Sequence, residues 1–139
     1  MELVDERTPT SVLASLDYAE ATIAMVLADR EVQLASARRA AARYRVVGSV
    51  LGVALAKARE AEALLRLGRV AEAQSVLREA LPLARSMGNH WIVGTILRYF
   101  GTASLADGDI DAARNYVGEA LQYYRGGAGF LNRKSPLYK

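Results

Sequence analysis

A nine-residue unit that occurs twice restricts the fold of this chain more than any other feature of its sequence. Residues 65–73 read Leu-Arg-Leu-Gly-Arg-Val-Ala-Glu-Ala, and residues 105–113 read Leu-Ala-Asp-Gly-Asp-Ile-Asp-Ala-Ala. The first leucine, the glycine, a β-branched residue and the last alanine stand at the same places in both copies. Each unit has the pattern of a turn between two helices, and a period of about 40 residues predicts an array of helical repeats.

A weaker copy of this unit lies upstream, over residues 27–35. It aligns Leu27, Val32 and Ala35 with the same columns, but Arg30 stands where the other copies have glycine. In this alignment Arg30 corresponds to Gly68, so the spacing from Arg30 to Gly68 is slightly shorter than the spacing from Gly68 to Gly108. The sequence therefore predicts three units with a period of about 38–40 residues.

The composition favours an all-α protein. Alanine and leucine are abundant, whereas the chain has only 3 prolines and 7% aromatic residues, so strand-forming residues are few. We expect three antiparallel helix pairs. The expected organisation is a frayed N-terminus over residues 1–8, helix pairs over about 9–46, 49–87 and 89–125, and a flexible, glycine-rich tail over 126–139.

Several classes of protein do not fit this sequence. The absence of cysteine excludes disulfides, thiolate zinc sites and cysteine nucleophiles, and fits a reducing compartment. The acidic start does not resemble a secretory signal. The longest uncharged runs, 46–56 and 86–97, are much shorter than the roughly 20 residues that cross a membrane. We expect a soluble, cytoplasmic protein that does not interact with membranes.

The repeated columns resemble the tetratricopeptide repeat, a helix-turn-helix unit. The third repeat matches best, at Leu97, Phe100, Gly101, Gly108, Ile110, Ala113, Val117, Ala120 and Leu121. The long period and the run Ala-Arg-Ser-Met-Gly-Asn-His-Trp over 84–91 are similar to the repeats of large bacterial ATP-dependent transcription regulators of the LuxR type. The resemblance implies an α-α superhelix that recognises a partner. The nucleotide-binding and DNA-binding modules of those regulators are not recognisable here, so we expect a fragment or a stand-alone repeat protein.

In that family the first helix of each pair lines a concave surface that holds a ligand. In the third pair, Trp91, Thr95, Arg98 and Thr102 form one stripe at helical spacing, opposite the side that is expected to enter the core. Their expected counterparts on the two preceding pairs are Arg59, Glu62, Arg66, Asp17 and Glu20. An aromatic ring, arginines and carboxylates could hold an extended peptide with an acidic group. The alternative interpretation is that this face is solvated or self-associating and that Trp91 packs in the core.

The sequence gives little support for catalysis or for cofactor binding. His90 is the only histidine and has no serine or cysteine arrangement near it. Asp107, Asp109 and Asp111 have the spacing of a calcium loop but lack its later glycine and glutamate, so we interpret them as residues that cap the sixth helix. We expect no enzyme activity, cofactor or metal.

The sequence thus predicts a non-catalytic scaffold that binds a protein or peptide segment, as the repeat region of a transcription regulator would. Homo-oligomerisation through the uncapped third repeat or the tail is the first alternative. Nucleic-acid binding is another and rests on Arg38, Arg39, Arg43 and Arg45. It is not favoured, because 18 basic and 15 acidic residues nearly balance and only Tyr44 could stack on a base within this cluster. We expect the four arginines to point outward into solvent.

Overall fold

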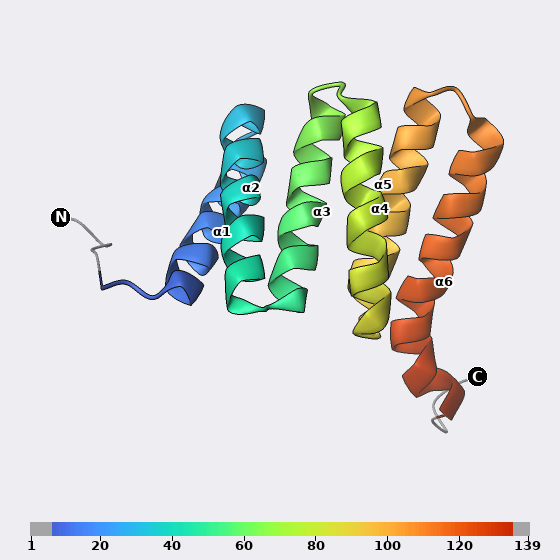
Figure 1. Ribbon diagram of the computed structural model, residues 1–139. Coiled ribbons are helices and arrows are strands. Elements are labelled where there is room, and N and C mark those ends of the chain that lie inside the picture. Colours follow the sequence, from blue (N-terminus) through green and yellow to red (C-terminus); the bar gives the residue numbers. More distant parts are fainter. Residues whose placement is uncertain (1–6, 135–139) are drawn as a thin grey trace.

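The computed structural model describes the backbone of residues 7–134 and the side chains of residues 7–126. Within these residues the chain is entirely helical. The helices stand side by side in chain order (Figure 1), and they are α1 (Thr10–Val26), α2 (Arg30–Val47), α3 (Val50–Arg66), α4 (Val70–Ser86), α5 (His90–Ala106) and α6 (Ile110–Lys134). The predicted all-α class and the arrangement in consecutive helical hairpins are confirmed. Most of the expected frayed N-terminus, residues 1–6, lies outside the described residues.

Every turn between helices contains one residue in the left-handed backbone region, and these residues define the repeat. They are Ala28, Gly48, Gly68, Gly88 and Gly108, with φ between 61° and 79°. Positions 28, 68 and 108 are equally spaced, and 48 and 88 have the same spacing, so the period is about 40 residues. Glycine adopts this conformation without strain, whereas alanine at position 28 does so at a cost of about 1 kcal/mol.

This spacing corrects the alignment of the first repeat. Arg30 does not occupy the glycine column, because it is the first residue of α2, and Ala28 takes the left-handed position instead. The sequence pattern pairs Leu27 with Leu65, but the backbone gives Leu27 the place of Leu67. A search for glycine could not find this register because alanine replaces it.

Side-chain caps begin four of the helices. Each capping oxygen accepts a hydrogen bond from the backbone N–H three residues later, at 3.0–3.2 Å, and the caps are Asp29, Ser49, Asn89 and Asp109. Such caps satisfy N–H groups that have no partner within the helix. The capping interpretation of Asp109 is thus confirmed. Asp107 has a different role, since it accepts a hydrogen bond from Gln74 at 3.1 Å.

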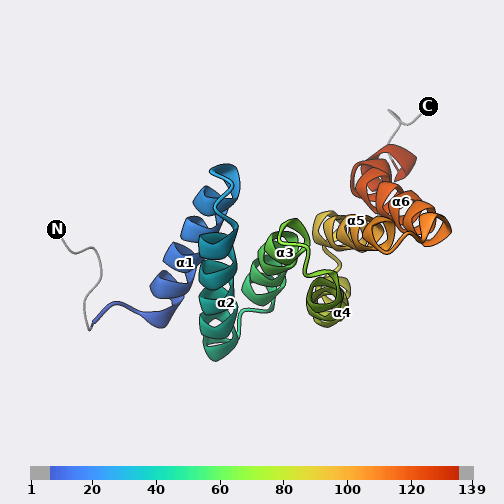
Figure 2. The same ribbon diagram turned by 90° about the horizontal axis from the view of Figure 1, so that it is seen from above.

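The helices form two rows. Each helix packs on its neighbours in the chain, and α3 also packs on α1 and α5. In the described part of the chain α2, α4 and α6 do not pack on one another, although side-chain ion pairs link Arg38 of α2 to Glu72 of α4 and Arg85 of α4 to Glu119 of α6. The view from above shows α3 between α2 and α4 (Figure 2). We call α1, α3 and α5 the inner row and α2, α4 and α6 the outer row.

The core lies between the rows and is largest around α3, α4 and α5. Its fully buried aliphatic side chains include Leu64, Leu77, Ile96 and Leu97. Nearer the N-terminus the buried residues are mostly alanines, which let helices approach closely. Among residues 7–134, no helix has the length and apolarity needed to cross a membrane.

The last helix is longer than the sequence predicts. The sequence pattern ends it near Tyr124, with a flexible tail from residue 126, but α6 continues to Lys134. Glycines weaken a helix by about 1 kcal/mol each without removing the backbone N–H, and the next residue after Tyr124 that lacks this donor is Pro136. Residues 135–139 of the expected tail lie outside the described residues.

Candidate binding surface

A groove between α3 and α5 brings four of the sequence-predicted site residues together. Its volume is about 220 Å³, and it is lined by Glu62, Leu65, Arg66, Arg98, Tyr99 and Thr102. The helical register explains this arrangement, because residues three and four apart share one face of a helix. The stripe on α5 and its expected counterparts on α3 therefore face each other across the inner row.

Neighbouring donors already occupy the carboxylate of Glu62 in this groove. Its Oε1 accepts hydrogen bonds from Arg30 at 3.3 Å and from Gln33 at 3.2 Å, and its Oε2 accepts one from the Tyr99 hydroxyl at 3.3 Å. Burial, together with the charge of Glu62, raises the pKa of Tyr99 above its ordinary value. Tyr99 therefore stays a neutral donor at physiological pH.

The arginines of the inner row lack such partners. Among the described residues, Arg59, Arg66 and Arg98 form no ion pair. The guanidinium of Arg98 lies 5.1 Å from the ring centre of Tyr99, and that of Arg59 lies 5.6 Å from the ring centre of Tyr18. The Nε of Arg59 is buried without a hydrogen-bond partner in the described part of the chain. Glu62 pairs with Arg30, so Arg59, Arg66 and Arg98 are charges of the inner row that no ion pair of the described residues balances.

Trp91 and Thr95 lie on the same stripe, where α5 meets α6. Trp91 is 70% exposed, and its ring centre is 4.9 Å from that of Tyr124. The Thr95 hydroxyl lies 2.9 Å from the Tyr124 hydroxyl. The exposure of Trp91 overturns the interpretation in which this ring packs in the core. Sequence reasoning missed Tyr124 as a partner because it placed the end of the sixth helix there.

The sequence-predicted residues on α1 do not belong to this surface. Asp17 is buried and forms ion pairs with Arg39, at 3.4 Å, and with Arg43, while Glu20 pairs with Arg39 at 3.1 Å. Both carboxylates therefore face α2 and are committed to intramolecular pairs. Neither of them lines the groove between α3 and α5.

The repeat register gives the reason. In the register that the left-handed turn residues define, the α1 counterparts of Arg59 and Glu62 are Ala19 and Thr22. The alignment from sequence alone, offset by two residues, could not identify them. On α1, the ring of Tyr18 contacts α3 through Arg59.

The basic cluster on α2 is largely neutralised within the chain. Arg38 pairs with Glu60 at 2.9 Å and with Glu72 at 3.6 Å, and Arg39 and Arg43 hold Asp17. These three side chains form ion pairs with neighbouring helices, which the sequence did not predict. Arg38, Arg39 and Arg45 are nevertheless exposed, as expected. Arg45 is its only member without an ion pair among the described residues.

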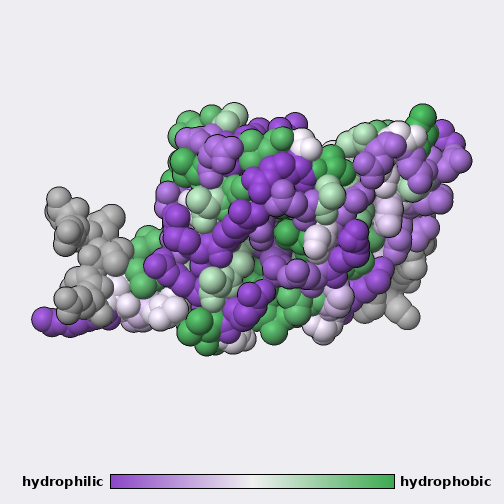
Figure 3. Space-filling model, turned by 45° about the horizontal axis from the view of Figure 1, so that its top comes forward, coloured by the Kyte–Doolittle hydropathy of each residue, from purple (hydrophilic) through white to green (hydrophobic). Residues whose placement is uncertain are grey.

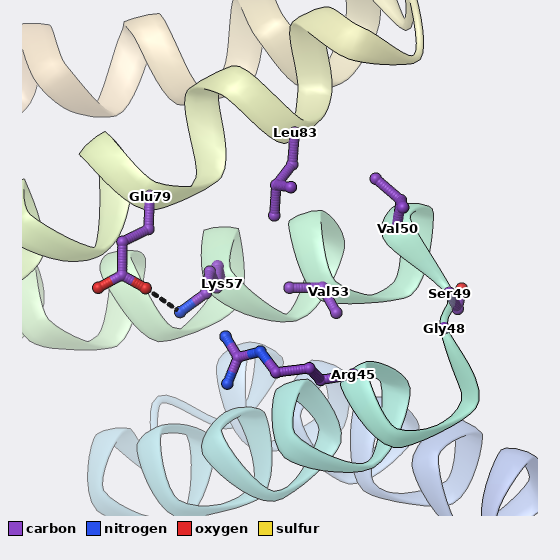
Figure 4. A pocket seen from close by; sticks show the side chains of 8 residues that line it. All are labelled: Arg45, Gly48, Ser49, Val50, Val53, Lys57, Glu79 and Leu83. Atoms are coloured by element: carbon purple, nitrogen blue, oxygen red, sulfur yellow. Dashed lines mark ion pairs between the residues drawn. The ribbon is translucent and has the colours of Figure 1, made fainter.

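A second cavity, which sequence reasoning missed, opens between α2, α3 and α4. Its volume is about 310 Å³, and it is lined by Arg45, Gly48, Ser49, Val50, Val53, Lys57, Glu79 and Leu83 (Figure 4). The side chain of Lys57 is only 9% exposed and contacts Glu79 at 2.8 Å. This hydrogen bond and charge lower the pKa of the Glu79 carboxyl. Lys57 and Glu79 lie far apart in sequence and on different helices, so no local pattern could reveal the pair.

A related cavity lies one repeat later, between α5 and α6. It is also about 310 Å³ in volume and is lined by His90, Glu119, Gln122, Tyr123 and Gly126. There Glu119 pairs with Arg85 at 3.3 Å, whereas its counterpart Glu79 pairs with Lys57. His90 lies edge-on to Tyr123, with ring centres 5.8 Å apart. Among residues 7–126, no three histidine, cysteine, aspartate or glutamate side chains are placed to hold a metal ion.

On the face seen in Figure 3, hydrophilic and hydrophobic residues are interspersed. In comparisons with protein-family models, with curated proteins and with solved structures, no match to this chain was found.

Proposed function

We propose that this chain is a non-catalytic recognition scaffold that binds an extended protein segment rich in carboxylates along its inner row. In this proposal the three helical hairpins form a superhelix like that of tetratricopeptide repeats, and α3 and α5 supply the centre of the binding surface. The resemblance of the sequence to the repeats of LuxR-type regulators suggests that such a segment belongs to a partner or to another part of a transcription regulator.

One observation carries the proposal. Arg66 and Arg98 border a groove in which the lining carboxylate, Glu62, is already engaged by Arg30, Gln33 and Tyr99. The groove thus offers two cations, Arg66 and Arg98, that form no ion pair with the described residues. Hydrogen bonds between a guanidinium and a carboxylate are stronger than those between neutral groups, and the two oxygens of a carboxylate match the paired N–H donors of a guanidinium. An aspartate or glutamate side chain of a ligand fits this chemistry.

The test is a peptide screen with the single tryptophan as reporter. Trp91 is exposed and lies on the same stripe as Arg98, so binding along the inner row changes its fluorescence. We expect acidic peptides to be selected over neutral ones, with an affinity that falls as salt is added. Arg98→Gln and Arg66→Gln should each weaken binding about tenfold, equivalent to about 1.4 kcal/mol.

Arg78→Gln is the matched control. Arg78 is exposed on α4 and forms no ion pair among the described residues, so its substitution changes the net charge equally without touching the inner row. If Arg78→Gln weakens binding as much as Arg98→Gln, the attraction is one of net charge and no inner-row site exists. A screen that selects no acidic peptide would also reject the proposal.

Nucleic-acid binding through α2 is the weaker alternative. Arg38, Arg39 and Arg43 already pair with carboxylates of this chain, and a phosphate backbone would have to displace those carboxylates. Binding of an arbitrary oligonucleotide that is lost in Arg38→Gln but kept in Arg98→Gln would favour this alternative.

A further inference from the structure

The outward side of α1, at the N-terminal end of the stack, carries an uncovered apolar stripe. Its members are between 41% and 75% exposed, and they are Val12, Leu16, Ile23, Val26 and Leu27. Their spacing of three, four and seven residues places them along one side of the helix. These five large aliphatic side chains share one side of the helix and form an apolar patch, whereas exposed apolar residues are normally scattered singly.

The repeat register identifies what this stripe is built to contact. On α3 the counterparts of Val12, Leu16 and Ile23 are buried against α2, and these are Gly52, Ala56 and Ala63. On α5 the counterparts Ile92, Ile96 and Ala103 are all buried, and Ile92 and Ile96 belong to the core that α4 contributes to. In both internal repeats, therefore, this side of an inner-row helix packs on the outer-row helix of the preceding hairpin. On α1 it packs on nothing in the described part of the chain.

The opposite end of the stack carries the complementary side of an outer-row helix. Val117 and Leu121 on α6 are 41% and 44% exposed. Their α2 counterparts, Ala37 and Ala41, are buried. Their α4 counterparts, Leu77 and Leu81, belong to the core that includes α5. This side of α2 and α4 contacts the next inner-row helix, and α6 has no such helix to contact among the described residues.

Within the described residues, α6 is not followed by a further inner-row helix that could cover its exposed side. The chain turns after α2 and α4 at Gly48 and Gly88, and the next position in this series is Ala128. Ala128 is helical, and α6 runs past it to Lys134 instead of turning back into another inner-row helix. Up to that residue, the chain itself does not cover the exposed side of α6.

We propose that copies of this chain stack head to tail, with α6 of one copy packed on α1 of the next. In this contact Leu121 of one copy meets Leu16 of the next, as Ala41 meets Ala56 inside the chain. The contact continues the helical repeat across the junction and buries both apolar ends. Because the two surfaces differ, the association is heterologous and open-ended, so it grows beyond a dimer.

Two charge substitutions test this proposal by light scattering over a wide concentration range. The wild-type chain is expected to increase in mass with concentration and to pass the mass of a dimer. Leu16→Glu removes the α1 surface and Leu121→Glu removes the α6 surface, so each variant alone should remain monomeric. An equal mixture of the two should form a dimer and nothing larger, because each variant keeps the surface that the other has lost.

Val46→Glu is the control, since Val46 is exposed but lies at the end of α2, outside both surfaces. It should assemble like the wild type, and circular dichroism should show equal helicity in all variants. A wild-type chain that stays monomeric overturns the proposal. So does a Leu121→Glu variant that still dimerises while Leu16→Glu does not, because that pattern means a symmetric contact between two α1 helices. The inner-row arginines are unchanged in these variants, so peptide binding is tested separately.

Discussion

Lys57 occupies in the second hairpin the place that Asp17 occupies in the first, one repeat earlier. Both residues form an ion pair with an outer-row helix, but Asp17 supplies the anion of its pair and Lys57 the cation. Asp17 pairs with Arg39 on α2, and Lys57 pairs with Glu79 on α4, which in turn stands one repeat after Arg39. In the third hairpin the same position is Leu97, which is fully buried. One buried position thus holds an anion, a cation or an aliphatic side chain. In the two charged cases the outer-row helix supplies the opposite charge, whereas in the third hairpin Glu119, the counterpart of Glu79, pairs with Arg85 instead.

This relationship predicts that the two charges of the Lys57–Glu79 ion pair can be exchanged between the helices. Lys57→Asp places two carboxylates side by side and should lower the free energy of unfolding by about 2 kcal/mol, less than for a fully buried pair because Glu79 is exposed. The double substitution Lys57→Asp with Glu79→Arg recreates the arrangement of the first hairpin and should recover most of this loss. Urea unfolding followed by circular dichroism measures both.

Lys57→Leu is the control for that reversal, because leucine already occupies the equivalent position in the third hairpin. It should change the free energy of unfolding by less than about 1 kcal/mol, since the remaining Glu79 is well solvated. The equivalence of the three positions is refuted if the double variant is no more stable than Lys57→Asp alone.

Ala28 is the one described residue other than glycine with a positive φ. Ala28→Gly should therefore stabilise the chain by about 1 kcal/mol, because it relieves the strain of a left-handed alanine. The reciprocal change at the equivalent position, Gly68→Ala, should destabilise it by a similar amount. Thermal unfolding of both variants checks the two signs, and an Ala28→Gly variant less stable than wild type would contradict the repeat register.

Two helical glycines should respond to alanine in opposite ways. A methyl group on Gly52 would overlap the ring of Tyr44, so Gly52→Ala should cost about 1–3 kcal/mol. A methyl group on Gly118 meets open space, so Gly118→Ala should stabilise α6 by about 0.5–1 kcal/mol through helix propensity. Chemical denaturation compares the pair. Equal effects would mean that α2 and α3 do not approach as closely as the structure shows.

Tyr99 should make the fold sensitive to alkaline pH. Burial and the charge of Glu62 raise its pKa, so the folded chain holds this proton more tightly than the unfolded chain. Its contribution to stability is complete below the ordinary tyrosine pKa of about 10 and is lost as pH rises through the higher folded value. An absorbance titration should contain a late step, above the ordinary tyrosine pKa, and Tyr99→Phe should remove that step.

The substitution Glu62→Gln separates the two causes of the raised pKa of Tyr99, which are burial and the charge of Glu62. Removing the charge should move the late step toward the ordinary pKa while leaving the part due to burial. If the late step survives in Tyr99→Phe, another tyrosine is responsible and the described environment of Tyr99 is wrong.

Local sequence patterns predict most of the fold. Glycines at 68, 88 and 108 and the capping residues Ser49 and Asn89 mark the helix ends directly, because their physical role is local. The first repeat was shifted by two residues because an alanine stands in the left-handed position, and the end of α6 was missed because consecutive glycines do not remove backbone donors. Both failures concern positions where the local pattern is ambiguous.

The candidate site was predictable only in part. Helical spacing places Arg98 and Thr102 on one side of α5, and the repeat period brings Glu62 and Arg66 opposite them. The partners that decide the charge of the groove could not be foreseen. Arg30 reaches Glu62 from another hairpin, and Asp17 turns toward Arg39 on α2. Such pairs depend on the packing of helices, which no local pattern encodes.

The most direct test of the proposed function is a nuclear magnetic resonance titration of the wild-type chain with the tightest acidic peptide from the screen. Backbone amide shifts locate the peptide on one row of helices. We predict that the changes concentrate on the inner row, around Arg66, Arg98 and Thr102. Changes concentrated on the outer row, around Glu79 and Leu83, would contradict the account and assign binding to the cavity between α2, α3 and α4.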